Sequence, residues 1–163
     1  MITPTNAPEW RTAEWFNTTT PLSLASLRGK VVLAVAFQML CPGCVSQGLP
    51  QAQRVREAFP DQEIAVIGLH TVFEHHEAMT PVSLKAFLHE YRVTFPVGVD
   101  EPDPNGPIPR TMRAYEMRGT PTTLLFDREG RLQRQVFGHL PDLQLGAELM
   151  KLIGDSDERL RQG

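Results

Sequence analysis

Apolar runs of strand length and amphipathic segments of helical spacing alternate in the first half of the chain. Residues 30–37 (KVVLAVAF) and 63–69 (EIAVIGL) are largely apolar and rich in β-branched side chains. Such runs are typical of strands that are buried on both faces in the middle of a parallel sheet. Between them, residues 51–59 repeat apolar side chains on one helical face. The sequence therefore predicts a strand, a helix and a second strand in succession.

The second half of the chain predicts further helices and strands and one long loop. Thr80 followed by Pro81 is a typical helix start, and apolar residues recur at helical spacing from Leu84 to Tyr91. The segment Asp127–Gly130 indicates a tight hairpin turn. The other expected elements are a strand at residues 95–99, a proline-rich loop at 100–109, a short helix at 110–115, strands at 122–126 and 132–137, and a last helix at 141–153 followed by a polar tail. Together they predict one α/β domain, residues 1–163 with a core at about 7–153, built on a mixed β-sheet flanked by helices.

Length, charge and hydropathy exclude several classes of protein. The chain has 163 residues and a net charge of −3, and no run of Lys or Arg is longer than a pair. Nucleic-acid-binding domains usually carry a basic face, so we expect no nucleic-acid partner. No apolar stretch approaches the roughly 20 residues that span a bilayer, and the N-terminus lacks the charged and apolar segments of a signal peptide. We therefore expect no membrane partner and a cytoplasmic location.

The two cysteines of the chain, Cys41 and Cys44, lie between the first buried strand and the first helix. A disulfide between them would close too short a loop to stabilise the fold much, so the spacing favours a catalytic dithiol. At the start of a helix, free N–H groups and the helix dipole stabilise the thiolate of Cys41. Pro42 presets the backbone of the first turn. Cys44 follows one turn later, so we expect Cys41 to be the nucleophile and Cys44 the more buried, resolving thiol.

Four motifs together resemble the thioredoxin superfamily, and in particular the TlpA-like thiol–disulfide reductases, which belong with the redoxin and AhpC/TSA proteins. These motifs are Gly29-Lys30-Val31-Val32, Cys41-Pro42-Gly43-Cys44, Gly119-Thr120-Pro121-Thr122-Thr123 and Asp127-Arg128-Glu129-Gly130. The resemblance covers nearly the whole chain. It implies a thioredoxin-like fold with an N-terminal extension and an insertion around residues 70–81.

The resemblance also implies an activity and a site. The activity is thiol–disulfide exchange through a redox-active Cys41–Cys44 disulfide, with no other cofactor and no metal. The implied partners are a protein or small-molecule disulfide or thiol and an electron-donor dithiol. A cis peptide bond between Thr120 and Pro121 would face the dithiol, and with Pro42 and Gly43 these residues would shape the partner site. The backbone beside the cis-proline would pair with an extended segment of the partner.

The sequence departs from the family pattern at places that affect the chemistry. Val35 stands where thioredoxin has a buried acid beside the dithiol, so the usual proton acceptor is missing. Pro50 follows Cys44 by six residues where relatives usually have five, which predicts a bulge in the first helix. Phe37 and Leu40 take the place of the tryptophans that often precede the first cysteine.

His70 is the polar residue that we place closest to the dithiol by topology. It follows the second buried strand, and the carboxyl ends of parallel strands share one edge of a sheet. Two hypotheses remain open: His70 accepts the proton of Cys44, or it is a buried polar residue with satisfied hydrogen bonds. A zinc site made by the cysteines with His70, His75 or His76 is disfavoured, because the spacing does not fit a zinc-finger pattern.

Two other functions remain as alternatives to thiol–disulfide exchange. A peroxiredoxin-type thiol peroxidase would need its P-x-x-x-T-x-x-C loop. Before Cys41 the chain has Ala34 and Gln38 at the proline and threonine positions, so fast peroxide reduction is not expected. The second alternative is a non-catalytic thioredoxin-fold module that senses redox state or binds a partner.

Overall fold

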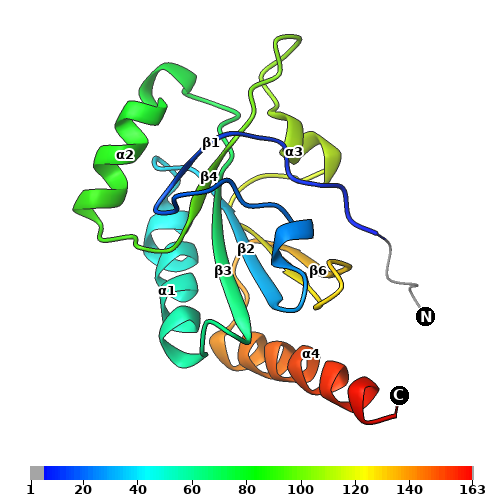
Figure 1. Ribbon diagram of the computed structural model, residues 1–163. Coiled ribbons are helices and arrows are strands. Elements are labelled where there is room, and N and C mark those ends of the chain that lie inside the picture. Colours follow the sequence, from blue (N-terminus) through cyan, green and yellow to red (C-terminus); the bar gives the residue numbers. More distant parts are fainter. Residues whose placement is uncertain (1–5, 163) are drawn as a thin grey trace.

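The computed structural model describes residues 6–162, with side chains to residue 155, and is built on a six-stranded mixed sheet (Figure 1). The strand order is β1-β4-β3-β2-β5-β6. The central strands β2, β3 and β4 are parallel, and the other pairings are antiparallel. The strands are β1 (Thr12–Phe16), β2 (Val31–Phe37), β3 (Ile64–His70), β4 (Val97–Asp100), β5 (Thr122–Phe126) and β6 (Leu132–Phe137).

Helical elements cover both faces of this sheet. The α-helices are α1 (Leu49–Ala58), α2 (Pro81–Glu90), α3 (Arg110–Ala114) and α4 (Asp142–Gln162), and the short elements are the 3₁₀-helices η1 (Ala25–Leu27) and η3 (His76–Ala78) and the π-helix η2 (Cys44–Gly48). Apolar residues of α1, α2 and α4 pack with one face of the sheet. Residues of α3 and of the segment before β2 pack with the other. Within residues 6–162, no helix has the length and apolar character needed to cross a membrane.

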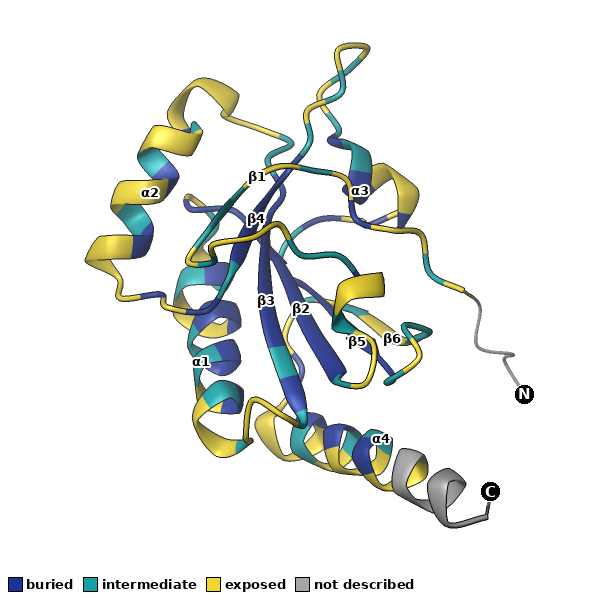
Figure 2. Cartoon of the chain, viewed as in Figure 1, coloured by how far each residue is buried: buried dark blue, intermediate teal, exposed yellow. Residues whose placement is uncertain are grey.

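The continuous apolar run of β2 follows from its place at the centre of these layers. Leu33, Val35 and Phe37 belong to the core on the α1 side, whereas Ala34 and Ala36 belong to the core on the α3 side. Every residue of β2 is buried, as Figure 2 shows. Because both faces of the strand are covered by other elements, neither face needs polar side chains.

The first helix contains the bulge that the position of Pro50 predicts. The five residues of η2 form a π-turn that continues into α1. Helical structure already begins at Pro42, directly after Cys41, so the predicted start at residue 51 is wrong. The extra residue is accommodated as a local widening of the helix.

Other predicted boundaries are confirmed to within a few residues, with three corrections. Strand β1 was not predicted, because it is a half-exposed edge strand that pairs only with β4. The strand expected at 95–99 begins at Val97, since Pro96 has no N–H to donate to the sheet. The last helix continues to Gln162, although the sequence beyond residue 153 lacks apolar periodicity.

The capping and turn signals agree with the structure. The Thr80 side chain accepts a hydrogen bond from the Ser83 N–H at the start of α2. The turn between β5 and β6 closes with a bond from the Gly130 N–H to the Asp127 carbonyl, and Gly130 has φ +78°. Glycine takes this conformation without a steric penalty, which explains its place in the turn.

Candidate active site

Cys41 and Cys44 lie where the loop after β2 turns into the first helix. Their sulfur atoms are 2.6 Å apart, and both are free thiols. Cys41 is half-buried, whereas Cys44 is 0% exposed. The Cys44 backbone N–H points at the Cys41 sulfur at 3.3 Å. The structure therefore separates an accessible sulfur, which receives a hydrogen bond, from a buried one within reach of it.

The buried thiol resists ionisation. Burial, and next the hydrogen bond with Cys41, raise the pKa of Cys44 to about 12. A backbone hydrogen bond at Gln38 and a side-chain hydrogen bond from Thr120 act in the opposite direction. Burial is therefore the main obstacle to forming the Cys44 thiolate, and the hydrogen bonds to its sulfur modify that effect.

The loop that contains the cis-proline lies against the dithiol, as predicted. The Thr120–Pro121 peptide bond is cis, and the Cys41 sulfur lies 3.5 Å from the Thr120 carbonyl oxygen. A Cβ atom at Gly43 would lie 3.5 Å from the Pro121 ring, and one at Gly48 would lie 3.2 Å from it. The start of the helix thus packs directly on the proline, closely enough at Gly48 to favour a residue without a side chain.

Gln38 connects three segments that meet at the dithiol. Its side chain is 1% exposed. Its Nε2 group donates to the Thr120 hydroxyl at 3.4 Å, and its Oε1 accepts from the Phe73 backbone N–H at 3.2 Å. Its own carbonyl oxygen accepts from the Cys41 N–H at 3.2 Å. The sequence placed this residue only at the threonine position of the peroxiredoxin loop, although a polar side chain directly after a buried strand was a visible signal.

His70 lies at the sheet edge expected from topology, but its bonding favours a structural role. The ring is buried, and its Nε2 accepts the backbone N–H of Met39 at 3.3 Å. Burial lowers the pKa of His70 to about 4, so the ring is neutral near pH 7. Of the two hypotheses, this bonding favours a buried polar residue with satisfied hydrogen bonds, because the Met39 N–H occupies the ring nitrogen that would have to receive the proton.

Comparisons with known proteins identify the family. Residues 5–135 match the AhpC/TSA family. The chain belongs to this family. A solved thioredoxin-like superfamily protein is 62% identical, with a TM-score of 0.90 over 91% of this chain and 96% of its own. A thiol-disulfide isomerase from Corynebacterium glutamicum is 47% identical, with a TM-score of 0.87 over 91% of this chain and 97% of its own.

Curated relatives are more distant. Thiol-disulfide oxidoreductase ResA from Bacillus thuringiensis is 23% identical over 80% of this chain and 68% of its own length. Protein DipZ from Mycobacterium bovis is 29% identical over 76% of this chain. The chain matches only 17% of the length of DipZ.

The surface around the dithiol of this AhpC/TSA family member has an apolar part. The two apolar residues before Cys41 differ in exposure: Met39 is 8% exposed and Leu40 is 59% exposed. Phe137 is half-exposed, and the Arg118 guanidinium lies 5.9 Å from the centre of its ring. A Cβ at Gly119 would lie 2.9 Å from the Phe137 ring, so this aromatic side chain packs beside the cis-proline loop.

None of the four other histidines is buried as His70 is. His75, His76 and His89 are exposed, and the His76 ring bonds to the Pro107 carbonyl oxygen. In the part of the chain whose side chains are described, no three His, Cys, Asp or Glu residues gather as metal ligands would.

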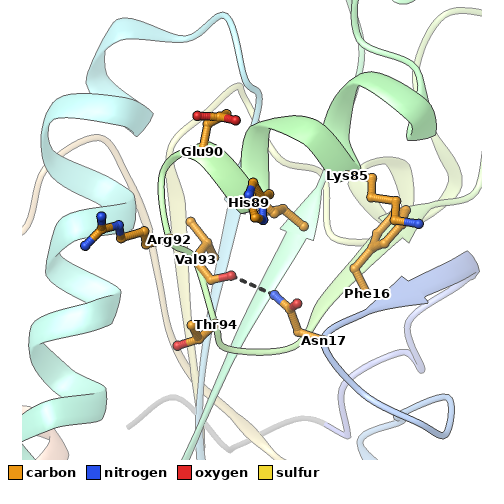
Figure 3. A pocket seen from close by; sticks show the side chains of 9 residues that line it. Phe16, Asn17, Lys85, His89, Glu90, Arg92, Val93 and Thr94 are labelled. Atoms are coloured by element: carbon orange, nitrogen blue, oxygen red, sulfur yellow. Dashed lines mark hydrogen bonds between the residues drawn. The ribbon is translucent and has the colours of Figure 1, made fainter.

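A large hollow of about 820 Å³ lies elsewhere, between the end of β1, the end of α2 and residues 92–94 (Figure 3). Asn17 closes one side of it through hydrogen bonds to the carbonyl oxygens of Val93 and Phe95, at 2.8 Å and 3.0 Å. Neither cysteine lines the hollow, nor does any residue of the cis-proline loop. The dithiol is therefore a surface site outside this hollow.

Proposed function

We propose that the protein is a thiol–disulfide oxidoreductase in which Cys41 attacks the substrate and Cys44 resolves the intermediate. The observation that carries this proposal is the pairing of an accessible and a buried sulfur 2.6 Å apart at the start of a helix. Two relatives of this chain, a thiol-disulfide isomerase and a thiol-disulfide oxidoreductase, support the same activity.

The reaction follows from the positions of the two sulfurs. The thiolate of Cys41 attacks one sulfur of a substrate disulfide, and the substrate's S–S bond breaks. One substrate thiolate leaves and takes up the proton lost by Cys41. Cys44 then loses its proton and attacks the Cys41 sulfur, forming the Cys41–Cys44 disulfide and releasing the second substrate thiolate, which takes up that proton. Two electrons pass from the protein to the substrate, and an external dithiol returns them, so no organic cofactor or metal is needed.

The partner site is formed by the backbone and by the apolar surface beside it. The Thr120 carbonyl oxygen and the neighbouring cis-proline face the reactive sulfur, as a partner in extended conformation would require. Leu40 and Phe137 add exposed apolar area near this backbone. This arrangement favours a disulfide within a protein or peptide over a small disulfide as the substrate.

The variant Cys44→Ser should trap a mixed disulfide between Cys41 and its substrate, because the resolving thiol is missing. We expect the reduced variant, mixed with a disulfide-containing peptide, to give a covalent adduct of one peptide chain in a mass spectrum. Cys41→Ser is the matched control and should give no such adduct, since Cys44 is buried. Adducts of equal yield in both variants, or in neither, would contradict the assigned roles.

Membership of the AhpC/TSA family makes thiol peroxidase activity the second candidate. A peroxidatic cysteine needs donors that stabilise the departing oxygen. Gln38 stands at the threonine position of the peroxiredoxin loop, and both ends of its amide are already bonded within the protein. We therefore expect oxidation by hydrogen peroxide to be much slower than exchange with the peptide disulfide. A rate constant for peroxide on the order of 10⁵ M⁻¹s⁻¹ or more would favour the peroxidase instead.

A further inference from the structure

We propose that Arg118, held over the ring of Phe137 beside the cis-proline loop, selects substrates that carry an acidic side chain close to the attacked cysteine. The inference rests on the proposed function, because it names the class of peptide or protein disulfide that reaches Cys41. Arg118 binds a carboxylate of the substrate and takes no part in the exchange of sulfurs. Its effect is therefore on the first step, in which the substrate is captured.

The Phe137 ring lies directly against the cis-proline loop. A Cβ at Gly119 would lie 2.9 Å from the ring. Phe137 pairs across β5 and β6 with Thr122, the residue that follows the cis-proline. The Gly138 N–H donates to the Pro121 carbonyl oxygen at 2.9 Å. Backbone pairing therefore fixes the ring beside the loop, although the side chain is 52% exposed.

The ring in turn supports the guanidinium of Arg118, whose central carbon lies 5.9 Å from the ring centre. A guanidinium over an aromatic face is attracted by the ring, which restricts the positions that the side chain takes. Arg118 is nevertheless exposed. Among the carboxylates whose side chains are described, none pairs with it, and these include Glu116, its nearest acidic neighbour in the sequence. The charge is therefore positioned in advance and available to a partner.

The two segments that carry the dithiol and the cis-proline are uncharged. Residues 31–53, which include both cysteines, and residues 119–126, which include the cis-proline, contain no Asp, Glu, Lys, Arg or His. Arg118 is the charged residue that directly adjoins the cis-proline loop. Charge complementarity at an interface raises the rate of association and selects among partners. The surface therefore fits a partner with an acidic residue better than one with a basic residue.

The path from the reactive sulfur to Arg118 limits where the acidic residue can stand. The Cys41 sulfur lies 3.5 Å from the Thr120 carbonyl oxygen, and Arg118 precedes Thr120 by two residues. An extended segment of the substrate advances about 3.3 Å per residue, so a side chain about two or three positions from the attacked cysteine reaches the level of Arg118. A carboxylate there can accept two hydrogen bonds from the guanidinium.

Peptides with one cysteine, activated as its neutral 2-pyridyl disulfide, test this selection. The Cys41 thiolate attacks the peptide sulfur and breaks the S–S bond of the reagent. It releases 2-thiopyridone, which takes up the proton lost by Cys41 and whose absorbance gives the rate. In one set of three peptides the residue two positions after the cysteine is Glu, Gln or Lys, and in a second set it is the residue two positions before. If no peptide releases thiopyridone, the proposed function fails and the inference with it.

With the unmodified protein at low salt, the glutamate peptide of at least one set should react about three- to fivefold faster than its glutamine counterpart, the size expected for an exposed ion pair. The lysine peptide should be the slowest. The preference should weaken between about 50 mM and about 500 mM salt, because ions screen exposed charges. Equal rates for the glutamate and glutamine peptides in both sets would overturn the inference and leave the proposed function intact.

Arg118→Gln should remove the preference for glutamate, and Arg118→Glu should reverse it, so that the lysine peptide becomes the fastest. Both substitutions stand at an exposed position, so folding should not depend on them. Phe137→Leu keeps an apolar side chain but removes the ring under the guanidinium, and it should reduce the preference to less than about twofold. A preference that survives in Arg118→Gln would contradict the proposal, as would an undiminished preference in Phe137→Leu.

Arg28→Gln is the matched control. Arg28 is also an exposed arginine that pairs with none of the carboxylates whose side chains are described. It precedes β2, whereas Cys41 follows that strand, so the two residues belong to opposite ends of it. Its loss changes the net charge equally and should leave the preference unchanged. If Arg28→Gln weakens the preference as much as Arg118→Gln does, the effect comes from net charge and the proposal is wrong.

Glutathione activated as the same 2-pyridyl disulfide separates a peptide partner from a small acidic thiol. It carries carboxylates but no extended segment that could pair along the cis-proline loop. We expect it to react more slowly than the glutamate peptide and to lose less than about twofold in Arg118→Gln. A loss as large as that of the glutamate peptide, together with a faster reaction, would assign Arg118 to a small acidic thiol and overturn the proposal.

Discussion

Replacing His70 with leucine should cost about 2.5 kcal/mol more stability at pH 6.5 than at pH 4, whereas replacing Asp100 with asparagine should cost about 2 kcal/mol less at pH 6 than at pH 4. The two residues are neighbours at the ends of adjacent strands, because His70 of β3 pairs with Val99 of β4. Both side chains are buried, and both titrate within the same pH range with opposite effects on stability.

The signs follow from the direction of each pKa shift. Burial lowers the pKa of His70 from 6.5 to about 4, so its contribution is present above pH 6.5 and is lost as the pH falls toward 4. Burial raises the pKa of Asp100 from 3.8 to about 6, although its carboxylate accepts the N–H groups of Thr111 and Met112. Its contribution is therefore present below pH 3.8 and is lost as the pH rises through about 6.

Urea unfolding of the two variants and the unmodified protein, at several pH values between 4 and 6.5, measures both effects. The quantity to compare is how the difference in free energy of unfolding between each variant and the unmodified protein changes with pH. The size of that difference at a single pH also contains the loss of hydrogen bonds, which either substitution causes. Val82→Ala, at an exposed position on α2 that carries no titratable group, is the control and should show a difference that does not vary with pH. Parallel pH curves for all four proteins would show that neither buried group carries the proposed linkage.

Phe37→Ala should lower the free energy of unfolding by about 3–5 kcal/mol, since it opens a cavity at the centre of the core. The ring is completely buried and lies 5.1 Å from His70 and 6.4 Å from Phe87, measured between ring centres. It also lies against Gly68, where a Cβ would come within 3.1 Å of it. Sheet backbone borders the ring there, so the cavity cannot collapse easily.

Phe137→Ala provides the same change of side chain at a half-exposed position. We expect it to lower the free energy of unfolding by less than about 1 kcal/mol, because water already contacts much of the ring. Denaturant midpoints of the two variants give the comparison. Similar losses for Phe37 and Phe137 would mean that the core around β2 is less tightly packed than the structure shows.

Most of the fold was predictable because its elements carry local signals. The apolar run of residues 30–37 predicts a strand covered on both faces, and Thr80 followed by Pro81 predicts the start of a helix. Strand β1 carries no comparable signal, since its five residues are half-exposed and its pairing partner lies more than eighty residues away. The position of β1 in the sheet depends on pairing with the edge of β4, and the local sequence of β1 contains no signal for that pairing.

The parts of the site that lie in short contiguous motifs could be predicted from the sequence. The cysteines and the cis-proline belong to short sequences whose resemblance to known proteins is specific. The roles of Gln38 and His70 depend on bonds to Thr120, Phe73 and Met39, which come from other segments of the chain. Topology placed His70 at the correct edge but could not show that a backbone N–H already occupies its ring nitrogen.

The π-turn at Cys44–Gly48 lets the beginning of the helix hold one added residue, while the following residues of α1 keep their packing against the sheet. An α-helix advances about 100° around its axis with each residue. One added residue in a regular helix would therefore turn Ala52 and Val55, which now face the core, toward a different side. The wide turn absorbs the added residue, so Cys44 remains beside Cys41 while the later turns stay in register with the sheet. The segment between the dithiol and Pro50 thus contains one residue more than a regular helix would allow, without any repacking of the core.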